Sequence, residues 1–338
     1  MAAQDAKVQL LTLPLEVRHK IFKHTLSDDA NPKKLLRYWF EKKETNALIA
    51  THVADDPTGP TPQVAHHVDA SEDDSDDEEE EQEEQADADA AADEDEDGEA
   101  DGDEELNEDD DEMDVDEQDE QDADGDATAT VATQPVQPAP VVMAARKWRH
   151  ITNFMRLTHR PPPMALFLAC HQLNAEAKNW YYDVAILRIA ATGSFAHTSF
   201  FEEAFSQITE AAFSPMESIR KVEVTFVWDT TWIRADTTGC VEAIFPALLR
   251  QRALFVLQIL AQAPDLREVV IHWHDSAQDG ESAMLRIDVL QPFDSLHATV
   301  KIVEHYITPE TKPHHKSIAG KQRVEFESIV EGGLDRLF

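Results

Sequence analysis

Glycine is scarce in this sequence, with 10 residues in 338, and the glycine-dependent motifs that bind phosphates are missing. The sequence holds no P-loop, G-x-G-x-x-G, G-x-S-x-G, H-E-x-x-H or paired C-x-x-C motif. Their absence argues against the nucleotide-binding, hydrolase and metalloprotease classes that carry them. We therefore expect a protein that binds other proteins, is not an enzyme and needs no cofactor.

Cysteine is equally scarce, because Cys170 and Cys240 are the only two. Two cysteines in apolar surroundings cannot form a disulfide framework, so we interpret them as buried thiols of a reducing compartment. No stretch approaches the roughly 18 consecutive apolar residues of a membrane span, and the N-terminus lacks the layout of a signal peptide. We expect an intracellular protein of the nucleus or cytoplasm, without a membrane partner.

Basic residues are missing from one segment, although the chain has a formal charge of -39. Residues 69–126 contain 37 Asp or Glu and no Lys or Arg, which leaves 31 acidic residues against 29 basic ones elsewhere. The rest of the chain is therefore nearly neutral. An acidic segment repels phosphate and attracts basic proteins, so we do not expect nucleic acid as a partner.

The composition divides the chain into three parts. Residues 1–50 form an N-terminal helical region, with a helix expected at 14–26 and a short second helix after it. Residues 51–143 hold too few apolar side chains to offset the entropy lost on folding, so a disordered acidic tract and a Pro-rich linker are expected. Residues 144–338 form an α/β body.

Within the body, the residue patterns predict alternating helices and strands. Helices are expected at 164–182, 197–210 and 240–264, and strands at 184–190, 219–228 and 266–275. The last two strands match each other at an offset of 47 residues, Val222 with Val269 and Val224 with Ile271. If this weak repeat is real, the strands pair in parallel in a short sheet with helices on one side; the alternative is chance similarity between two amphipathic strands.

Two segments resemble signatures of the fungal F-box-like proteins, which have a divergent N-terminal motif. The first resembles L-P-x-E-V-R-x-x-I-F and is matched by Leu13, Pro14, Glu16, Val17, Arg18, Ile21 and Phe22. The second lies within residues 164–190 and is matched by Leu168, Cys170, His171, Gln172, Leu173, Glu176, Ala177, Tyr181 and Tyr182. The strand near 219–228 resembles the one that follows these signatures in the family.

The resemblance implies an F-box-like helical unit that docks on the Skp-type adaptor of a cullin ubiquitin ligase, while the C-terminal part recruits a substrate. It assigns adaptor binding to Leu13, Pro14, Val17, Ile21 and Phe22. In ordinary F-box domains the helices are consecutive, whereas here the second signature follows the first by about 140 residues.

A long insertion between the two signatures is tolerable, because each doubling of a loop costs only about 0.6 kcal/mol. We therefore predict that the first helix packs through Leu13, Val17, Ile21 and Phe22 against the helix that bears Leu168, Leu173 and Tyr181. The expected fold class is α+β, a small helical unit followed by a mixed α/β body with a few strands and covering helices, split by a long disordered acidic insertion.

The acidic tract has two interpretations. It is either a scaffold or chaperone for basic nuclear proteins such as histones, or a solubilising spacer. Within it, Ser71 and Ser75 precede runs of acidic residues, as in the sites of acidophilic kinases, so both are candidate phosphorylation sites.

One histidine-rich strand end is the only candidate for metal chemistry. His272 and His274 would share one face of a strand, with Asp275 next to them. Since no third distant ligand can be identified, we interpret them as the polar face and exit turn of a half-buried strand, and expect no metal site.

Overall fold

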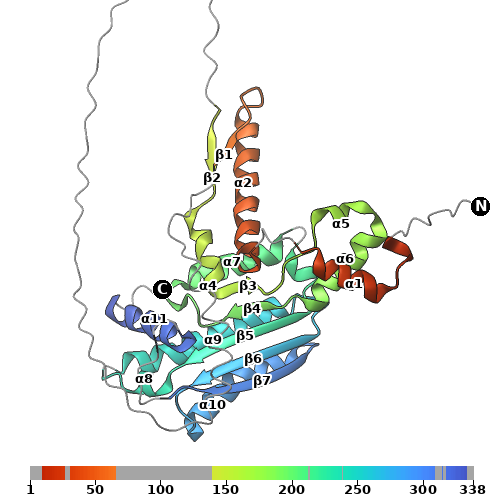
Figure 1. Cartoon of the computed structure of the whole chain (residues 1–338). Coiled ribbons are helices and arrows are strands. Elements are labelled where there is room, and N and C mark those ends of the chain that lie inside the picture. Colours follow the sequence, from red (N-terminus) through yellow and green to blue (C-terminus); the bar gives the residue numbers. More distant parts are fainter. Residues whose placement is uncertain are drawn as a thin grey trace, which may run out of the picture.

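The structure, a computed structural model, describes residues 10–26, 31–65, 139–211, 214–237, 239–308, 314 and 317–332. These residues form a five-stranded sheet with covering helices, an arm that projects from it, and a helical lobe at one side (Figure 1). The predicted α+β class is confirmed. Disorder was predicted for the acidic tract and linker at 51–143, and residues 66–138 of this range lie outside the described residues.

The main sheet has the strand order β3-β4-β5-β6-β7. β3 runs antiparallel to β4, and the remaining neighbours are parallel. The strands are β3 (Met155–Leu157), β4 (Leu187–Ala190), β5 (Lys221–Trp228), β6 (Glu268–Asp275) and β7 (Thr299–Tyr306).

The pairing of β5 with β6 follows the predicted offset. Val222 pairs with Val269, and Val224 pairs with Ile271. β6 alternates between half-buried and buried residues along its whole length, and β5 does so up to Phe226, after which Val227 and Trp228 are buried as well. Each strand therefore turns one row of side chains into the core. The parallel pairing expected from the repeat is therefore confirmed.

Helices cover the buried face of the sheet. They are α7 (Thr198–Glu210), α8 (Thr230–Arg234), α9 (Cys240–Leu260), α10 (Gly280–Leu290) and α11 (Ile318–Gly332). The core between sheet and helices is rich in aromatic rings; for example, Phe226 packs against Trp273 at a centroid distance of 5.9 Å and against Phe293 at 6.2 Å. Within the described ranges, α9 is long and apolar enough to cross a membrane, yet its side chains Phe245, Leu249 and Val256 are buried in this core.

The arm is built on α2 (Leu35–Asp55), which is much longer than the short second helix that we predicted. The base of α2 is buried where Phe40 stacks on Trp148 at 4.7 Å. Glu44 binds the same region, because its Oε2 accepts hydrogen bonds from Trp148 Nε1 at 2.6 Å and from Ala145 N at 2.8 Å. These contacts come from residues about 100 positions away, so the local sequence could not indicate the length of the helix.

Two short strands complete the arm beside α2. β1 (Gln63–Ala65) pairs in parallel with β2 (Val141–Met143). The ordered part of the chain therefore extends into residues 51–65 and 139–143, which we had assigned to the tract and linker. Between β2 and β4 the chain also forms α4 (Ile151–Phe154), α5 (Met164–Ala169) and α6 (His171–Val184). Short 3-10 helices occur at Leu10–Thr12, Pro32–Lys34, Arg146–His150, Phe195–His197, Pro215–Glu217 and Gln291–Ser295.

Candidate functional site

The helical lobe consists of residues 10–26 and 164–184, and so joins the two signature segments. Its first part contains α1 (Leu15–His24), which packs against α6. Phe22 of α1 is fully buried and forms a small apolar cluster with Leu173 and Ala177. Trp180 closes one side of this cluster, with its ring 6.0 Å from that of Phe22. The predicted packing of the first helix against the second signature is confirmed for Phe22 and Leu173.

An ion pair between the two signatures holds the lobe together. Arg18 Nε lies 2.7 Å from Glu176 Oε2, and Arg18 Nη2 lies 2.9 Å from Glu176 Oε1. Arg18 also donates to the carbonyl oxygens of Leu11 and Leu13. A hydrogen bond from Gln172, together with Arg18, holds the pKa of Glu176 below its usual range. A bidentate, largely buried pair of this kind fixes the relative position of two helices.

The break between α5 and α6 lies at Cys170. This residue has an extended backbone, and its sulfur accepts a hydrogen bond from Leu173 N at 3.5 Å, which caps the first turn of α6. Cys170 is half-buried and Cys240 is exposed. Our interpretation of both as buried thiols was wrong, because Cys170 caps a helix and Cys240 begins one at the surface.

The residues assigned to adaptor binding do not share one environment. Phe22 is in the interior of the lobe, Leu13 and Ile21 are half-buried, and Pro14 and Val17 are exposed. Our packing prediction was wrong for Val17. It was also wrong for Leu168, which is 78 % exposed. Because α1 turns only one narrow face to α6, its other apolar side chains remain at the surface.

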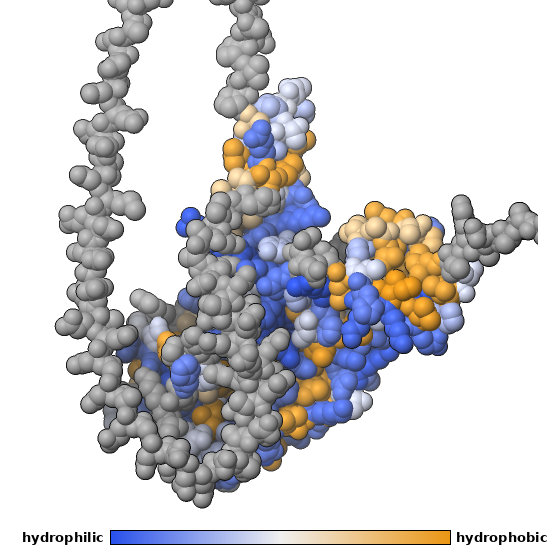
Figure 2. Space-filling view, in the orientation of Figure 1, coloured by the Kyte–Doolittle hydropathy of each residue, from blue (hydrophilic) through white to orange (hydrophobic). Residues whose placement is uncertain are grey.

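These uncovered side chains form what we call the lobe surface. It comprises Leu11, Leu15, Val17, Met164 and Leu168, which are between 39 % and 78 % exposed. Met164 and Leu168 are four residues apart on α5, so they lie on the same side of that helix. Figure 2 shows apolar residues gathered over the lobe. Such a concentration on a small unit is typical of a protein-binding site.

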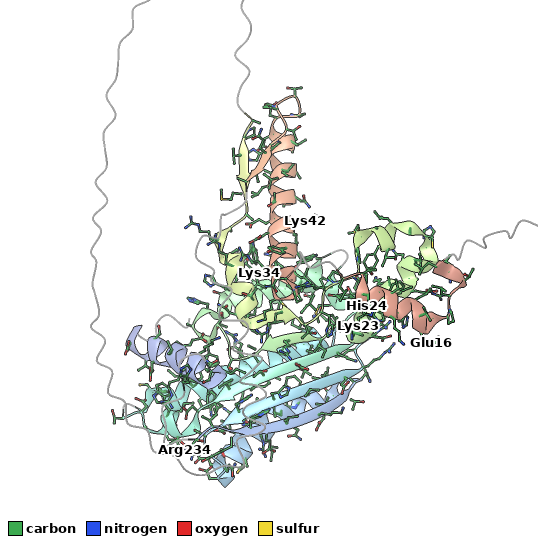
Figure 3. All side chains as sticks on the ribbon, viewed as in Figure 1. Glu16, Lys23, His24, Lys34, Lys42 and Arg234 are labelled. Carbon is green, nitrogen blue, oxygen red and sulfur yellow. The ribbon has the colours of Figure 1, made fainter. Side chains whose placement is uncertain are left out.

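Charged residues border the lobe surface. Glu16, Lys23 and His24 are exposed along α1, and Figure 3 shows them projecting from this helix. An apolar centre with a polar rim is the usual composition of a protein–protein interface. The sequence motif pointed to α1, but it could not separate the residues that hold the lobe from those that it exposes.

The candidate phosphorylation sites Ser71 and Ser75, and the whole acidic stretch 69–126, lie outside the described residues.

The prediction for the histidine-rich strand end is correct for the two histidines and wrong for Asp275. His272 and His274 share the half-exposed face of β6, whereas Asp275 lies on the opposite, buried face. Sequence reasoning missed His305 of β7, whose ring stacks on His274 at 4.2 Å and whose Nε2 lies 3.0 Å from His272 Nδ1. Within the described part of the chain, no group of three or more His, Cys, Asp or Glu residues could hold a metal ion.

The three imidazoles nevertheless affect one another. Burial, and to a lesser extent the neighbouring His305 and His272, together lower the pKa of His274 to about 3. The cluster could not be found in the sequence, since the pairing of β6 with β7 determines that His274 lies opposite His305.

No protein-family model, no curated protein and no solved structure matches this chain. The assignment of function therefore depends on the geometry of the lobe and on the two sequence signatures.

Proposed function

We propose that this chain is an F-box-like interaction protein that binds and does not catalyse. In this proposal the lobe surface docks on the Skp-type adaptor of a cullin ubiquitin ligase, and the α/β body recruits a substrate. The protein acts inside the cell, in the nucleus or cytoplasm.

The lobe surface is the observation that carries the proposal. The interior of the lobe is already filled by Phe22, Leu173 and Ala177, and its two halves are joined by Arg18 and Glu176. The exposed Val17, Met164 and Leu168 therefore have no part in holding the lobe. Burying apolar area against a partner would contribute about 25 cal/mol per Å², which favours a binding role for this surface.

The proposal predicts that the double variant Val17→Asp, Leu168→Asp loses adaptor binding. Two carboxylates at the centre of an apolar interface would have to be desolvated without partners, so the affinity should fall at least about tenfold, or about 1.4 kcal/mol. Isothermal titration of the full chain with a purified Skp-type adaptor measures this. Both positions are exposed, so thermal unfolding should remain within a few degrees of wild type.

A matched control is Leu254→Asp, which places the same charge at an apolar residue that is 47 % exposed on α9, away from the lobe. This variant should bind the adaptor as the wild type does. Equal binding by the double variant and the wild type, or no binding by the wild type, would refute adaptor docking through the lobe.

A second candidate function is that of a scaffold or chaperone for basic nuclear proteins. The observation in its favour is the charge of residues 69–126, with 37 acidic residues and no basic ones. Such a field attracts histones at low salt and weakens as the Debye length shortens from about 10 Å at 0.1 M salt to about 3 Å at 1 M.

We expect that replacing residues 66–138 by a Gly/Ser linker of about 12 residues leaves the fold intact and removes histone binding. The linker is long enough for a crossover between the parallel strands β1 and β2, and a shorter loop costs less entropy, about 0.6 kcal/mol for each halving. Thermal unfolding and salt-dependent histone titration test the two outcomes separately. If the variant were unfolded, residues 66–138 would not be a dispensable insertion. If it still bound histones as the wild type does, the scaffold role of the acidic residues would be contradicted.

A further inference from the structure

Strand β7 forms one edge of the main sheet. Its only strand neighbour among the described residues is β6. Seven of its eight residues are exposed, including Ile302 at 49 % and Tyr306 at 53 %. A long, exposed edge strand offers unpaired backbone groups to any extended chain that comes beside it.

The hydrogen-bond register shows which residues face outward. Thr299 N donates to Arg267 O at 2.8 Å and Ile307 N donates to Asp275 O at 2.9 Å, so both amides point toward β6. In a strand the direction of the backbone groups alternates from one residue to the next. The amides and carbonyls of Ile302 and Glu304 therefore point away from β6, toward the free edge.

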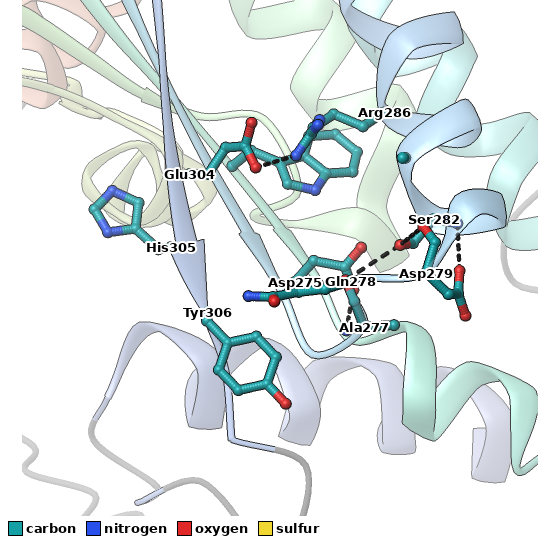
Figure 4. A pocket seen from close by; sticks show the side chains of 11 residues that line it. Asp275, Ala277, Gln278, Asp279, Ser282, Arg286, Glu304, His305 and Tyr306 are labelled. Carbon is teal, nitrogen blue, oxygen red and sulfur yellow. Dashed lines mark hydrogen bonds and ion pairs between the residues drawn. The ribbon is translucent and has the colours of Figure 1, made fainter.

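A cleft of about 310 Å³ lies between β7 and α10, directly beside this edge (Figure 4). Three carboxylates, those of Asp275, Asp279 and Glu304, line it together with Arg286 and the aromatic rings of Trp273 and Tyr306. Arg286 forms an ion pair with Glu304 across the cleft, and Asp279 pairs with Arg234. Side chains of an added strand would point into this cleft at every second position.

Asp275 lies at the end of β6 and lines the cleft, although it is only 6 % exposed. Its Oδ1 accepts hydrogen bonds from the backbone amides of Thr230 and Ala277, both at 3.2 Å. Burial raises the pKa of Asp275, because a surrounding of low dielectric disfavours the charged carboxylate. A cationic group in the cleft would stabilise the ionised form of this carboxylate. The carboxyl ends of parallel strands are also the usual ligand sites of such sheets.

Both elements that flank the cleft carry exposed apolar side chains. Met284 and Ile287 of α10 are 72 % and 57 % exposed, and Ile302 of β7 is 49 % exposed. Among the described residues, this edge therefore combines backbone groups without a strand partner, a neighbouring cleft with three carboxylates, and exposed apolar side chains.

We propose that the β7 edge binds an extended segment of a partner protein, which adds a strand beside β7 and places a lysine or arginine side chain in the cleft. This goes beyond the proposed adaptor docking, since it concerns a different surface. If the chain recruits substrates, the inference names their recognised element, an extended segment with one basic side chain among alternating apolar ones.

A second copy of this chain fits the edge less well. Twofold pairing would bring together two chains that each carry a formal charge of -39, and their mutual repulsion opposes association. A basic segment has the complementary charge.

The test is selection of a random ten-residue peptide library on the immobilised full-length chain, followed by titration of one selected peptide. Selected peptides should share a Lys or Arg at one position, with apolar residues alternating around it. Ile302→Pro removes an outward amide without removing a bond to β6, and should weaken peptide binding at least about tenfold. Asp275→Asn removes the charge at the cleft and should also weaken binding at least about tenfold.

Ile302→Thr is the matched control, because it keeps the amide and the strand propensity and should bind within about threefold of wild type. Far-ultraviolet dichroism checks that each variant is folded, and Asp275→Asn keeps the test decisive if the proline variant unfolds. The proposal is overturned if the selected peptides lack a common basic position, or if a folded Asp275→Asn variant binds them unchanged. It is equally overturned if the wild type is a dimer that Ile302→Pro converts to a monomer. Titration with the Skp-type adaptor tests the lobe surface separately, so failure of adaptor docking and failure of peptide binding can be distinguished.

Discussion

Replacing Phe22 by alanine is expected to lower the free energy of unfolding of the helical lobe by about 3–5 kcal/mol, as for other buried phenylalanines. Phe22 is fully buried and is the largest member of a cluster with only Leu173 and Ala177 at its centre. So small a cluster cannot collapse around the missing ring. Urea unfolding followed by intrinsic tryptophan fluorescence, together with hydrogen exchange of α1, measures the loss.

The neighbouring variant Val17→Ala provides the comparison, because Val17 lies on the same helix and is 40 % exposed. Its effect should stay within about 0.5 kcal/mol. If both variants were equally stable, α1 would not be packed on α6, and the distinction between the interior of the lobe and its surface would be lost. A stable Phe22→Ala variant with fast exchange in α1 alone would still support the packing, because it shows local opening of the lobe.

The second large effect concerns His274 and pH. Its folded pKa of about 3 lies below the ordinary value of 6.5, chiefly because of burial. At a pH between about 3 and 6.5, His274 is protonated in the unfolded chain and neutral in the folded chain. The stability from neutral His274 is therefore fully present above pH 6.5 and falls by about 1.4 kcal/mol per unit as the pH drops below it.

The many carboxylates of the chain also titrate on acidification, so the measurement must isolate the histidine. Denaturant unfolding of wild type and His274→Gln at pH 7.5, 6.5 and 5.5 does so, because the difference between the two profiles removes the shared contributions. The stability of the variant relative to wild type should increase as the pH falls. Parallel profiles would show that His274 titrates normally, and that its stacking on His305 has no influence on its protonation.

The sequence indicated those features that depend on local pattern. Alternation of apolar residues predicted β5 and β6 together with their register, and helical spacing predicted the core of α1 and of α6. The matched motif residues Arg18 and Glu176 were identified as well, although their role as an ion pair was not. Periodicity carries this information because one face of each element must be buried.

Tertiary structure alone decided which of these elements meet and which side chains remain exposed. The length of α2 depends on Trp148 and Glu44, and the partner of His274 depends on the position of β7. The same holds for the two candidate surfaces. Val17 is exposed because α1 packs on α6 by a single narrow face, and Leu168 is exposed on α5. The cleft beside the β7 edge is formed by residues of β6, β7 and α10. Contacts between distant segments follow from the packing of the whole chain, whereas a residue pattern reports only on its own segment.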